Sequence, residues 1–282
     1  MKQVLAVVGR GVVEWDETIA CADDLGLTRG DGCFEATLVT TKPELKVHNF
    51  TEHMERLARS GAAMEFVVPS VDAWQETLAA ALAVWSSERG ICKIVMNRGR
   101  EFAPGEPMAF LTLTDLASNV RMAESGIRVS CLTRGYTSDA FADAPWLLGG
   151  VKTTSYAVNM ASKREAARRG ADDVLFISSD GYALEGPTSG LVWLKDGKLG
   201  TVPAGATGIL DSITVAQVLE GAAAAGYECH RSLISLEDLK QVDAAWLMSS
   251  ARGVAPITAL DDTELAVHHE LSEQLRIWAD IV

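Results

Sequence analysis

Lys152 is the residue of this chain whose type and setting most directly predict chemistry. It follows a double glycine in Gly149-Gly150-Val151-Lys152 and precedes a stretch with helical spacing. The preceding Trp146-Leu147-Leu148 and Val151 give it an apolar context. Burial among such side chains disfavours the ammonium form, so the amine can act as a nucleophile that forms an imine. The segment therefore predicts a Schiff-base lysine.

Two later segments carry the groups that pyridoxal 5'-phosphate would need beside such a lysine. Glu185, in Leu184-Glu185-Gly186-Pro187, is a carboxylate that can keep a pyridine nitrogen protonated, which makes the ring an electron sink. Gly208-Ile209-Leu210 precedes a helix expected from about Asp211. Backbone N–H groups and the positive end of that helix are expected to point at a phosphate. The spacing of these groups predicts a pyridoxal-phosphate enzyme.

Three further side chains are assigned to the cofactor. Arg56, on a helix predicted over 51–64, supplies a cation for the phosphate, and Ser250, in Met248-Ser249-Ser250-Ala251, supplies a hydroxyl. Tyr156 follows Lys152 by one helical turn and is expected to bond the cofactor's ring hydroxyl. The alternatives are a surface ion pair for Arg56, a helix cap for Ser250 and a core tyrosine for Tyr156.

These segments resemble the class IV aminotransferases, the fold-type IV pyridoxal-phosphate enzymes. That group includes branched-chain and D-amino acid aminotransferases and 4-amino-4-deoxychorismate lyase. Arg29-Gly30-Asp31-Gly32-Cys33-Phe34-Glu35 is similar to the family's Gly-Asp-Gly strand entry, and His53-Met54-Glu55-Arg56-Leu57 to its His-x-x-Arg-Leu helix. The order of the motifs also agrees with the family over nearly the whole chain.

The resemblance implies a role for each matching position. Lys152 corresponds to the Schiff-base lysine, and Glu185 to the partner of the pyridine nitrogen. The implied cofactor-binding set adds residues that surround the phosphate or the ring: Arg56, Tyr156, Thr188, Ser189, Gly208, Ile209, Leu210 and Ser250. Two departures stand out. Many members have Ser-Asn after the Glu-Gly-x motif, whereas this chain has Thr188-Ser189 followed by Gly190. Tyr156 stands one position closer to the lysine than the corresponding tyrosine of the branched-chain enzymes.

Substrate contacts must separate a transaminase from a lyase, because both reactions begin with the same cofactor residues. Arg98 and Arg100 occupy a loop that resembles a carboxylate-binding segment of D-amino acid enzymes, reached from the partner subunit. Guanidinium groups bind carboxylates bidentately, although a solvated turn is the alternative explanation. The remaining substrate-binding residues implied by the resemblance are Phe34, Ser249 and Ala251.

We therefore expect an aminotransferase that moves an amino group between an amino acid and a 2-oxo acid. Aminodeoxychorismate lyase, which releases 4-aminobenzoate and pyruvate, is the alternative. A protein of the same fold that only binds pyridoxal phosphate or another anion is a further alternative, although the intact Lys152 and Glu185 count against it. The resemblance also implies a homodimer with shared active sites.

Composition narrows the remaining choices. The chain has 282 residues, 48% of them hydrophobic, and a net charge of −13 without a long basic run. This disfavours nucleic acid and anionic membranes as partners. The five cysteines are widely spaced and contain no Cys-x-x-Cys pair, which favours reduced thiols and no metal site. No apolar run approaches a membrane span, so a cytoplasmic location is expected.

The expected elements form two domains of an α+β, fold-type IV protein. Residues 1–118 are predicted to form a small α/β domain, with strands near 4–8 and 33–40 and a helix that starts at Ser70 and stops at Gly90. Residues 119–126 form the expected linker, and 127–282 a larger domain that carries Lys152, with a β-barrel-like core flanked by helices. Asp-Gly pairs at 180–181 and 196–197 predict hairpin turns.

Overall fold

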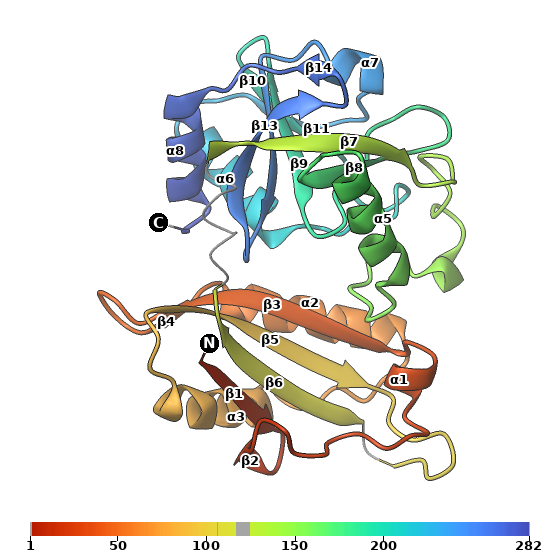
Figure 1. The fold of residues 1–282 in the computed structure, drawn as a ribbon, viewed down its shortest axis with the longest axis vertical. Helices are drawn as coiled ribbons and strands as arrows, with labels where there is room; N and C mark the ends of the chain where they lie inside the picture. Colours follow the sequence, from red (N-terminus) through yellow and green to blue (C-terminus); the bar gives the residue numbers. More distant parts are fainter. Residues whose placement is uncertain (1, 106, 117–124, 282) are drawn as a thin grey trace. The chain divides into compact units, whose positions relative to one another are not determined.

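The computed structural model describes residues 2–105, 107–116 and 125–281. The chain divides into two compact units (Figure 1), and each is described by itself. The first unit comprises Met1–Leu116 together with Val151–Tyr156, and the second comprises Ala117–Gly150 and Ala157–Val282.

The first unit contains, among its described residues, one six-stranded sheet with the strand order β2-β1-β6-β5-β3-β4. All neighbouring strands in it are antiparallel. Helix α2 packs on β3, and α3 packs on β1, β2 and β6. The elements are β1 (Gln3–Val7), β2 (Gly11–Val13), α1 (Leu25–Thr28), β3 (Gly32–Thr40), β4 (Lys46–Val47), α2 (Phe50–Ala63), α3 (Val71–Val84), β5 (Arg89–Asn97) and β6 (Met108–Asp115).

Strand β3 is central to the later argument because its side chains alternate between the two faces of the sheet. Glu35 points toward the face where α2 packs, and it meets His53 and Arg56 of that helix. Phe34 therefore points to the opposite face. This alternation separates two groups of functional side chains that are adjacent in the sequence.

The second unit contains, within the described part of the chain, an eight-stranded mixed sheet with the path β11-β10-β9-β12-β13-β7-β8 and with β14 paired to β13. The β13–β7 and β7–β8 pairs are parallel, whereas β9 pairs antiparallel with β10 and β12. Its strands are β7 (Ile127–Thr133), β8 (Asp173–Ile177), β9 (Gly190–Lys195), β10 (Lys198–Thr201), β11 (Cys229–Arg231), β12 (Ala244–Ser249), β13 (Gly253–Leu260) and β14 (Thr263–Glu264).

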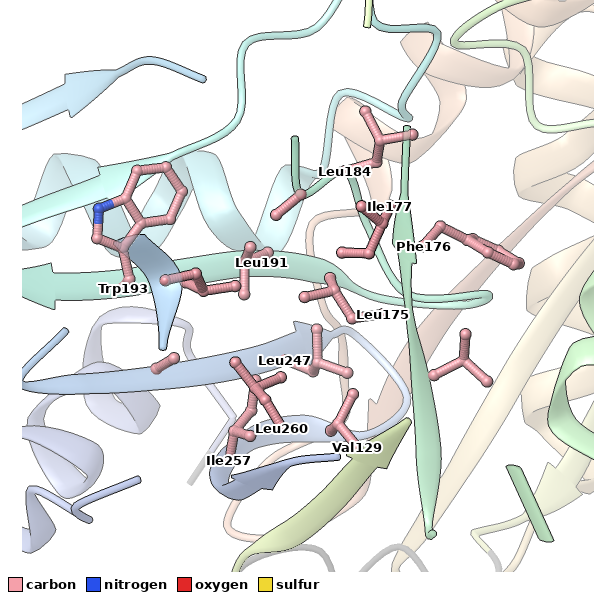
Figure 2. Packing of buried hydrophobic residues seen from close by; sticks show 14 of the residues in the cluster. Val129, Leu175, Phe176, Ile177, Leu184, Leu191, Trp193, Leu247, Ile257 and Leu260 are labelled. Carbon is pink, nitrogen blue, oxygen red and sulfur yellow. The ribbon is translucent and has the colours of Figure 1, made fainter. Parts of the chain in front are cut away.

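The second unit also contains the helices η2 (Pro145–Leu147), α5 (Ala157–Arg168), α6 (Ile213–Ala224), α7 (Leu236–Leu239) and α8 (His269–Trp278). Of these, α5 packs on β8, α6 on β12 and α8 on β13. Figure 2 shows side chains of β8, β9, β12 and β13, among them Leu175, Leu191, Leu247 and Ile257, packed into one apolar cluster. Burial of such side chains supplies the main driving force for this unit.

Several local predictions are confirmed by the elements. Ser70 caps α3, since its Oγ accepts a hydrogen bond from Ala73 N at 3.2 Å. Asp196-Gly197 forms the two-residue turn between β9 and β10, and both residues have positive φ, at 52° and 73°.

The predicted helix stop at Gly90 is wrong. Helix α3 ends at Val84, and Gly90 lies inside β5, where it pairs with Val39. A Cβ at Gly90 would lie 2.5 Å from Cζ2 of Trp85, so the glycine makes room for that indole ring. The packing of a tryptophan, rather than a helix end, explains this residue.

The domain division at 118 and 127 stays a prediction, and 119–124 of the expected linker lie outside the described residues. One difference concerns Lys152, which was expected in the C-terminal domain. In the structure the segment Val151–Tyr156 belongs to the first unit because its backbone pairs with β3. Within the described residues, no helix is both long and apolar enough to cross a membrane.

Candidate active site

Lys152 is held at the edge of the first sheet by its own backbone. Phe34 N donates to Lys152 O at 2.9 Å, Cys33 forms a β-bridge with Thr153, and Thr154 N donates to Gly32 O at 2.8 Å. Lys152 N donates to Oγ of Ser60 on α2 at 3.4 Å. A short strand-like segment therefore anchors the lysine on both β3 and α2.

The ring of Phe34 provides the apolar surface beside the Lys152 amine. Lys152 Nζ lies 4.6 Å from the centre of that ring, within the range of a cation–π contact. Of the apolar residues expected around the amine, Trp146 is 75% exposed and Leu147 is 50% exposed, whereas Leu148 and Val151 are half-buried. Burial of the amine by these residues stays a prediction.

Tyr156 packs edge-on against the same Phe34 ring, with the ring centres 5.2 Å apart and an interplanar angle of 74°. The side chain is half-buried. The structure thus brings Phe34, Lys152 and Tyr156 together, as expected for residues around one reacting amine. The bond from Tyr156 to a cofactor stays a prediction.

Arg56 is buried in an ion pair that the sequence did not reveal. Its Nε and Nη2 donate to Oε1 and Oε2 of Glu35, both at 2.7 Å, and His53 Nδ1 lies 2.6 Å from Oε2 of the same carboxylate. Arg56 precedes Ser60 by one turn of α2, so both residues lie on the same face of the helix. A surface ion pair is therefore excluded for Arg56, and the guanidinium is held on the helix face that contacts the Lys152 segment through Ser60.

The carboxylate of Glu35 remains ionised although no part of it reaches solvent. Burial alone would raise the pKa of Glu35, but hydrogen bonds and charges from Arg56 and His53 outweigh that cost and lower it to about 2. Glu35 lies on β3, whereas His53 and Arg56 lie on α2. The sequence alone therefore provided no direct signal that these three side chains would pair.

Replacing Glu35 with glutamine should destabilise the protein, since the Arg56 guanidinium would stay buried without its anion. We expect a loss of about 3–5 kcal/mol in the free energy of unfolding, measured by urea titration. Because the folded pKa lies below the unfolded one, the contribution is present above the unfolded pKa and is lost as the pH falls toward about 2. Glu88→Gln, which removes an exposed partner of Lys42, is the matched control and should change little. Equal effects of the two variants would contradict the buried pair.

Glu185 lies in the second unit, where its backbone is bonded to β8. Phe176 N donates to Glu185 O at 2.9 Å, and Glu185 Oε2 accepts from Leu210 N at 3.2 Å. The Glu185 residue is half-buried. The carboxylate is directed toward the predicted phosphate loop.

That loop differs in one respect from the prediction. Helix α6 starts at Ile213, and Ser212 Oγ caps it by accepting from Val215 N at 3.3 Å. Gly208-Ile209-Leu210 therefore lies before the helix, and the Leu210 N–H is engaged by Glu185. The phosphate role of Gly208, Ile209 and Leu210 stays a prediction.

Phe141 shapes the loop and was missed in the sequence. Gly208 has φ of 70°, and a Cβ there would lie 2.3 Å from the Phe141 ring. A Cβ at Gly149 would meet the same ring at 2.5 Å. Gly150 N donates to Gly208 O at 3.0 Å, so the two glycine-containing segments are joined beneath one aromatic ring. The glycines, more than the phenylalanine, are the sequence signal that could have indicated this packing.

The serine loop after β12 is also tied to α6. Thr214 Oγ1 and Ser250 Oγ lie 3.3 Å apart, and Ser249 Oγ accepts from Arg252 N at 3.3 Å. Ser249, Ser250 and Ala251 are half-buried. The hydroxyl of Ser250 is therefore placed beside the start of α6, and its grouping with the Gly208–Leu210 segment stays a prediction.

Ser189 provides a test of whether these residues suit the cofactor. Its side chain is 6% exposed, and Oγ has no hydrogen-bond partner within the described part of the chain. A buried hydroxyl without a partner is costly, so such a group is suited to a polar ligand. Together with the carboxylate of Glu185, this donor set fits a cofactor that carries a phosphate and a basic ring nitrogen. Thr188, by contrast, is exposed.

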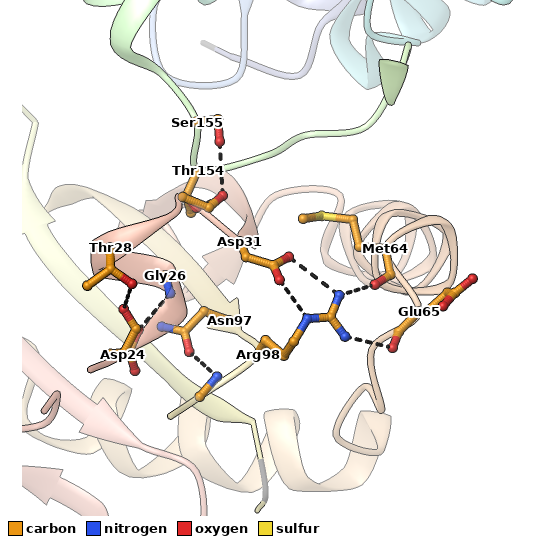
Figure 3. A network of polar contacts seen from close by, with 12 residues as sticks. Asp24, Gly26, Thr28, Asp31, Met64, Glu65, Asn97, Arg98, Thr154 and Ser155 are labelled. Atoms are coloured by element: carbon orange, nitrogen blue, oxygen red, sulfur yellow. Dashed lines mark hydrogen bonds and ion pairs between the residues drawn. The ribbon is translucent and has the colours of Figure 1, made fainter. Parts of the chain in front are cut away.

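Arg98 and Arg100 are already paired within the first unit. As Figure 3 shows, Arg98 donates to the Asp31 carboxylate, with Nε 2.6 Å from Oδ2, and to the carbonyl oxygens of Met64 and Glu65. Arg100 Nε lies 2.9 Å from Oδ1 of Asp23. Both arginines are nevertheless exposed, so the alternative of a solvated turn stays open. Their role in binding substrate stays a prediction, but the observed contacts are structural.

The predicted site residues thus form two groups, each within its own unit. The first unit brings together Phe34, Lys152 and Tyr156, whereas Arg56 pairs with Glu35 on the opposite face of β3. In the second unit, contacts link Glu185 with Leu210, and Ser250 with Thr214 at the start of α6.

Comparisons with known proteins show the family of the chain. A family model described as amino-transferase class IV matches residues 32–260. A Mycobacterium tuberculosis protein named bifunctional aminodeoxychorismate lyase / D-amino acid transaminase is 35% identical over 254 residues, which cover 86% of each chain.

Two solved structures extend the similarity to the whole fold. The fold IV-transaminase CpuTA1 of Curtobacterium pusillum is 37% identical, with a TM-score of 0.91, over 98% of this chain and 97% of that one. A hypothetical aminotransferase from Mycobacterium tuberculosis in its PLP-bound form is 33% identical, with a TM-score of 0.91, over 98% and 97% of the two chains. The predicted α+β, fold-type IV class is confirmed.

Proposed function

Because this chain belongs to the class IV aminotransferases and uses pyridoxal phosphate, we propose that it transfers an amino group between a D-amino acid and a 2-oxo acid. The observation that carries the proposal is Lys152, whose backbone is fixed on β3 and whose amine lies 4.6 Å from the Phe34 ring. The preference for D-amino acids is supported by the relative whose name includes D-amino acid transaminase.

Each group of residues has a distinct task in this proposal. When bound, pyridoxal phosphate supplies an electron sink for the electrons released at the substrate α-carbon. Lys152 forms the covalent link to the cofactor and, once displaced by substrate, accepts the α-proton at Nζ and returns it to a neighbouring atom. Phe34 covers one side of that amine, with Nζ 4.6 Å from the centre of its ring.

The remaining polar residues hold the cofactor. The Glu185 carboxylate keeps the ring nitrogen protonated, and the Ser189 hydroxyl supplies a buried hydrogen-bond partner. The phosphate is assigned to Arg56, Ile209, Leu210 and Ser250, with Glu35 holding the Arg56 guanidinium in position. These assignments rest on the family motifs together with the contacts described in each unit.

The test is a direct comparison of reactions catalysed by the cofactor-loaded protein. D-Alanine and D-glutamate should be converted with 2-oxo acid acceptors, and their L-enantiomers should react much more slowly. Exclusive use of L-amino acids, or no transamination at all, would contradict the proposal.

Aminodeoxychorismate lyase is a second candidate because the relative that is 35% identical carries both names. Release of 4-aminobenzoate from aminodeoxychorismate measures it in the same preparation. Release without any transamination would make the lyase the main function, whereas both activities together would parallel the name of that relative.

We also propose a homodimer and a cytoplasmic location. The dimer is inferred from the family resemblance, and the location is kept as the expectation stated from the sequence. Light scattering tests the dimer, since the monomer mass is 30.2 kDa. A monomeric mass for the active protein would overturn it.

A further inference from the structure

The serine loop, residues 249–253, joins β12 to β13 in a short hairpin. Ser249 pairs with Gly253, so the connection between the two strands consists of Ser250, Ala251 and Arg252. Ser249 Oγ accepts from Arg252 N at 3.3 Å, and Gly253 has φ of 78°, in the left-handed region that favours glycine. Ser250, which is assigned to the phosphate, therefore begins the connection that Arg252 ends.

The side chain of Arg252 is anchored by a buried carboxylate. Arg252 Nη2 forms an ion pair with Oδ2 of Asp173, the first residue of β8. The Asp173 side chain is fully buried, and that of Arg252 is 17% exposed. The other carboxylate oxygen, Oδ1, accepts a hydrogen bond from Val174 N at 2.8 Å, which ties the carboxylate to the backbone of β8. Because withdrawal of Arg252 would leave Asp173 as an uncompensated buried charge, the ion pair holds the arginine in this position.

Lys163 of α5 is a second cation beside the same carboxylate. Lys163 is half-buried, and α5 packs on β8. Burial lowers the pKa of Lys163, and the charge of Asp173 acts in the opposite direction, while that of Arg252 lowers it further. Lys163 therefore remains as a counter-charge for Asp173 when Arg252 is replaced, so we expect such a variant to stay folded.

The opposite end of the connection is tied to α6. Ser250 Oγ lies 3.3 Å from Oγ1 of Thr214, in the first turn of that helix. One contact thus directs the Ser250 hydroxyl, and the ion pair of Arg252 fixes the backbone two residues later. A binding group that is held in place before its ligand arrives loses less entropy on binding.

We propose that the ion pair between Asp173 and Arg252 positions the Ser250 hydroxyl for the cofactor phosphate. Asp173 and Arg252 are positioning residues, since they act through the backbone of the serine loop. The inference rests on the proposed function, because it takes Ser250 as a ligand of the phosphate. Direct contact of Arg252 with the phosphate is the competing explanation, because Arg252 Nη1 is buried without a hydrogen-bond partner in the described part of the chain.

The test compares pyridoxamine 5'-phosphate with pyridoxamine, which differ only in the phosphate and cannot form an imine with Lys152. Their dissociation constants are measured by calorimetry on the full chain after removal of its cofactor. In Arg252→Met the constant for pyridoxamine phosphate should rise about ten-fold or more, because a hydrogen bond to a charged group is weakened, whereas that for pyridoxamine should change by less than about two-fold. Arg252→Lys keeps the charge and should restore much of the affinity. Arg168→Met, which removes an exposed arginine paired with Glu165 in the same unit, is the matched control and should leave both constants unchanged.

A double-mutant cycle distinguishes positioning from direct contact. If Arg252 acts through Ser250, Arg252→Met should weaken binding of pyridoxamine phosphate by less than about two-fold in a Ser250→Ala background. An equal loss in both backgrounds would show direct contact and overturn the proposal. If circular dichroism shows that Arg252→Met is unfolded, the cycle is run with Asp173→Leu and Arg252→Met together, which removes both charges of the buried pair.

Transaminase activity separates this inference from the proposed function. Absence of transamination in a protein whose Arg252→Met variant shows the phosphate-specific loss would refute the proposed function alone. Transamination in a protein whose Arg252→Met variant loses affinity for both ligands equally, or for neither, would overturn the role of the ion pair.

Discussion

Replacement of Lys152 by alanine is expected to lower transaminase turnover by about 10³-fold or more, because the variant loses both the covalent link and the proton carrier. The fold should survive, since the bonds that hold the segment on β3 come from the backbone of Lys152 and of Thr154. Turnover of D-alanine at saturating cofactor is the measurement. Removal of the side chain thus tests chemistry with little change in structure.

Lys198→Ala is the matched control for this variant. Lys198 is an exposed lysine paired with Glu228, and its loss should not change turnover. Borohydride reduction of the loaded wild-type protein, followed by peptide mass mapping, should place the cofactor on Lys152. Attachment to another lysine, such as Lys93, would refute the assignment.

Glutamine in place of Glu185 is expected to lower turnover by about 10²-fold or more while the cofactor stays bound. The carboxamide oxygen can still accept the hydrogen bond from Leu210 N, so the loop should keep its conformation. What the variant removes is the negative charge that keeps the ring nitrogen protonated. Glu185→Gln therefore tests the effect of the negative charge on turnover without removing the hydrogen bond that holds the loop.

Cofactor absorbance and single-turnover kinetics measure the two effects separately. Glu228→Gln, an exposed glutamate of the same unit, should behave as the wild type. Wild-type turnover in Glu185→Gln with cofactor bound would show that Glu185 only supports the loop. Loss of cofactor together with turnover would place its main role in binding.

Much of the secondary structure was predictable because its causes are local. The Ser70 cap, the Asp196-Gly197 turn and the alternation along β3 depend on residues within a few positions of one another. Gly90 shows where local reasoning failed. A glycine after a helical pattern usually marks a helix end, but here it is required by the Trp85 ring that packs over β5.

The residue types that carry the chemistry were also evident from the sequence. The lysine after two glycines, the later glutamate and the glycine loop could be identified because each motif is contiguous and its chemistry follows from side-chain type. The family resemblance assigned them to one cofactor. The ring beside the Lys152 amine was not evident, because Phe34 lies far from Lys152 in the sequence.

Pairing between distant side chains was decided by the folded chain. The ion pair of Glu35 with Arg56, the bond from Leu210 to Glu185 and the commitment of Arg98 to Asp31 each join different segments. Periodicity in the sequence indicates which face of an element is buried, but not which residue of another element meets it. Strand register and helix packing bring such partners together, as the pairing of β5 with β3 brings Lys93 to the Phe34 ring.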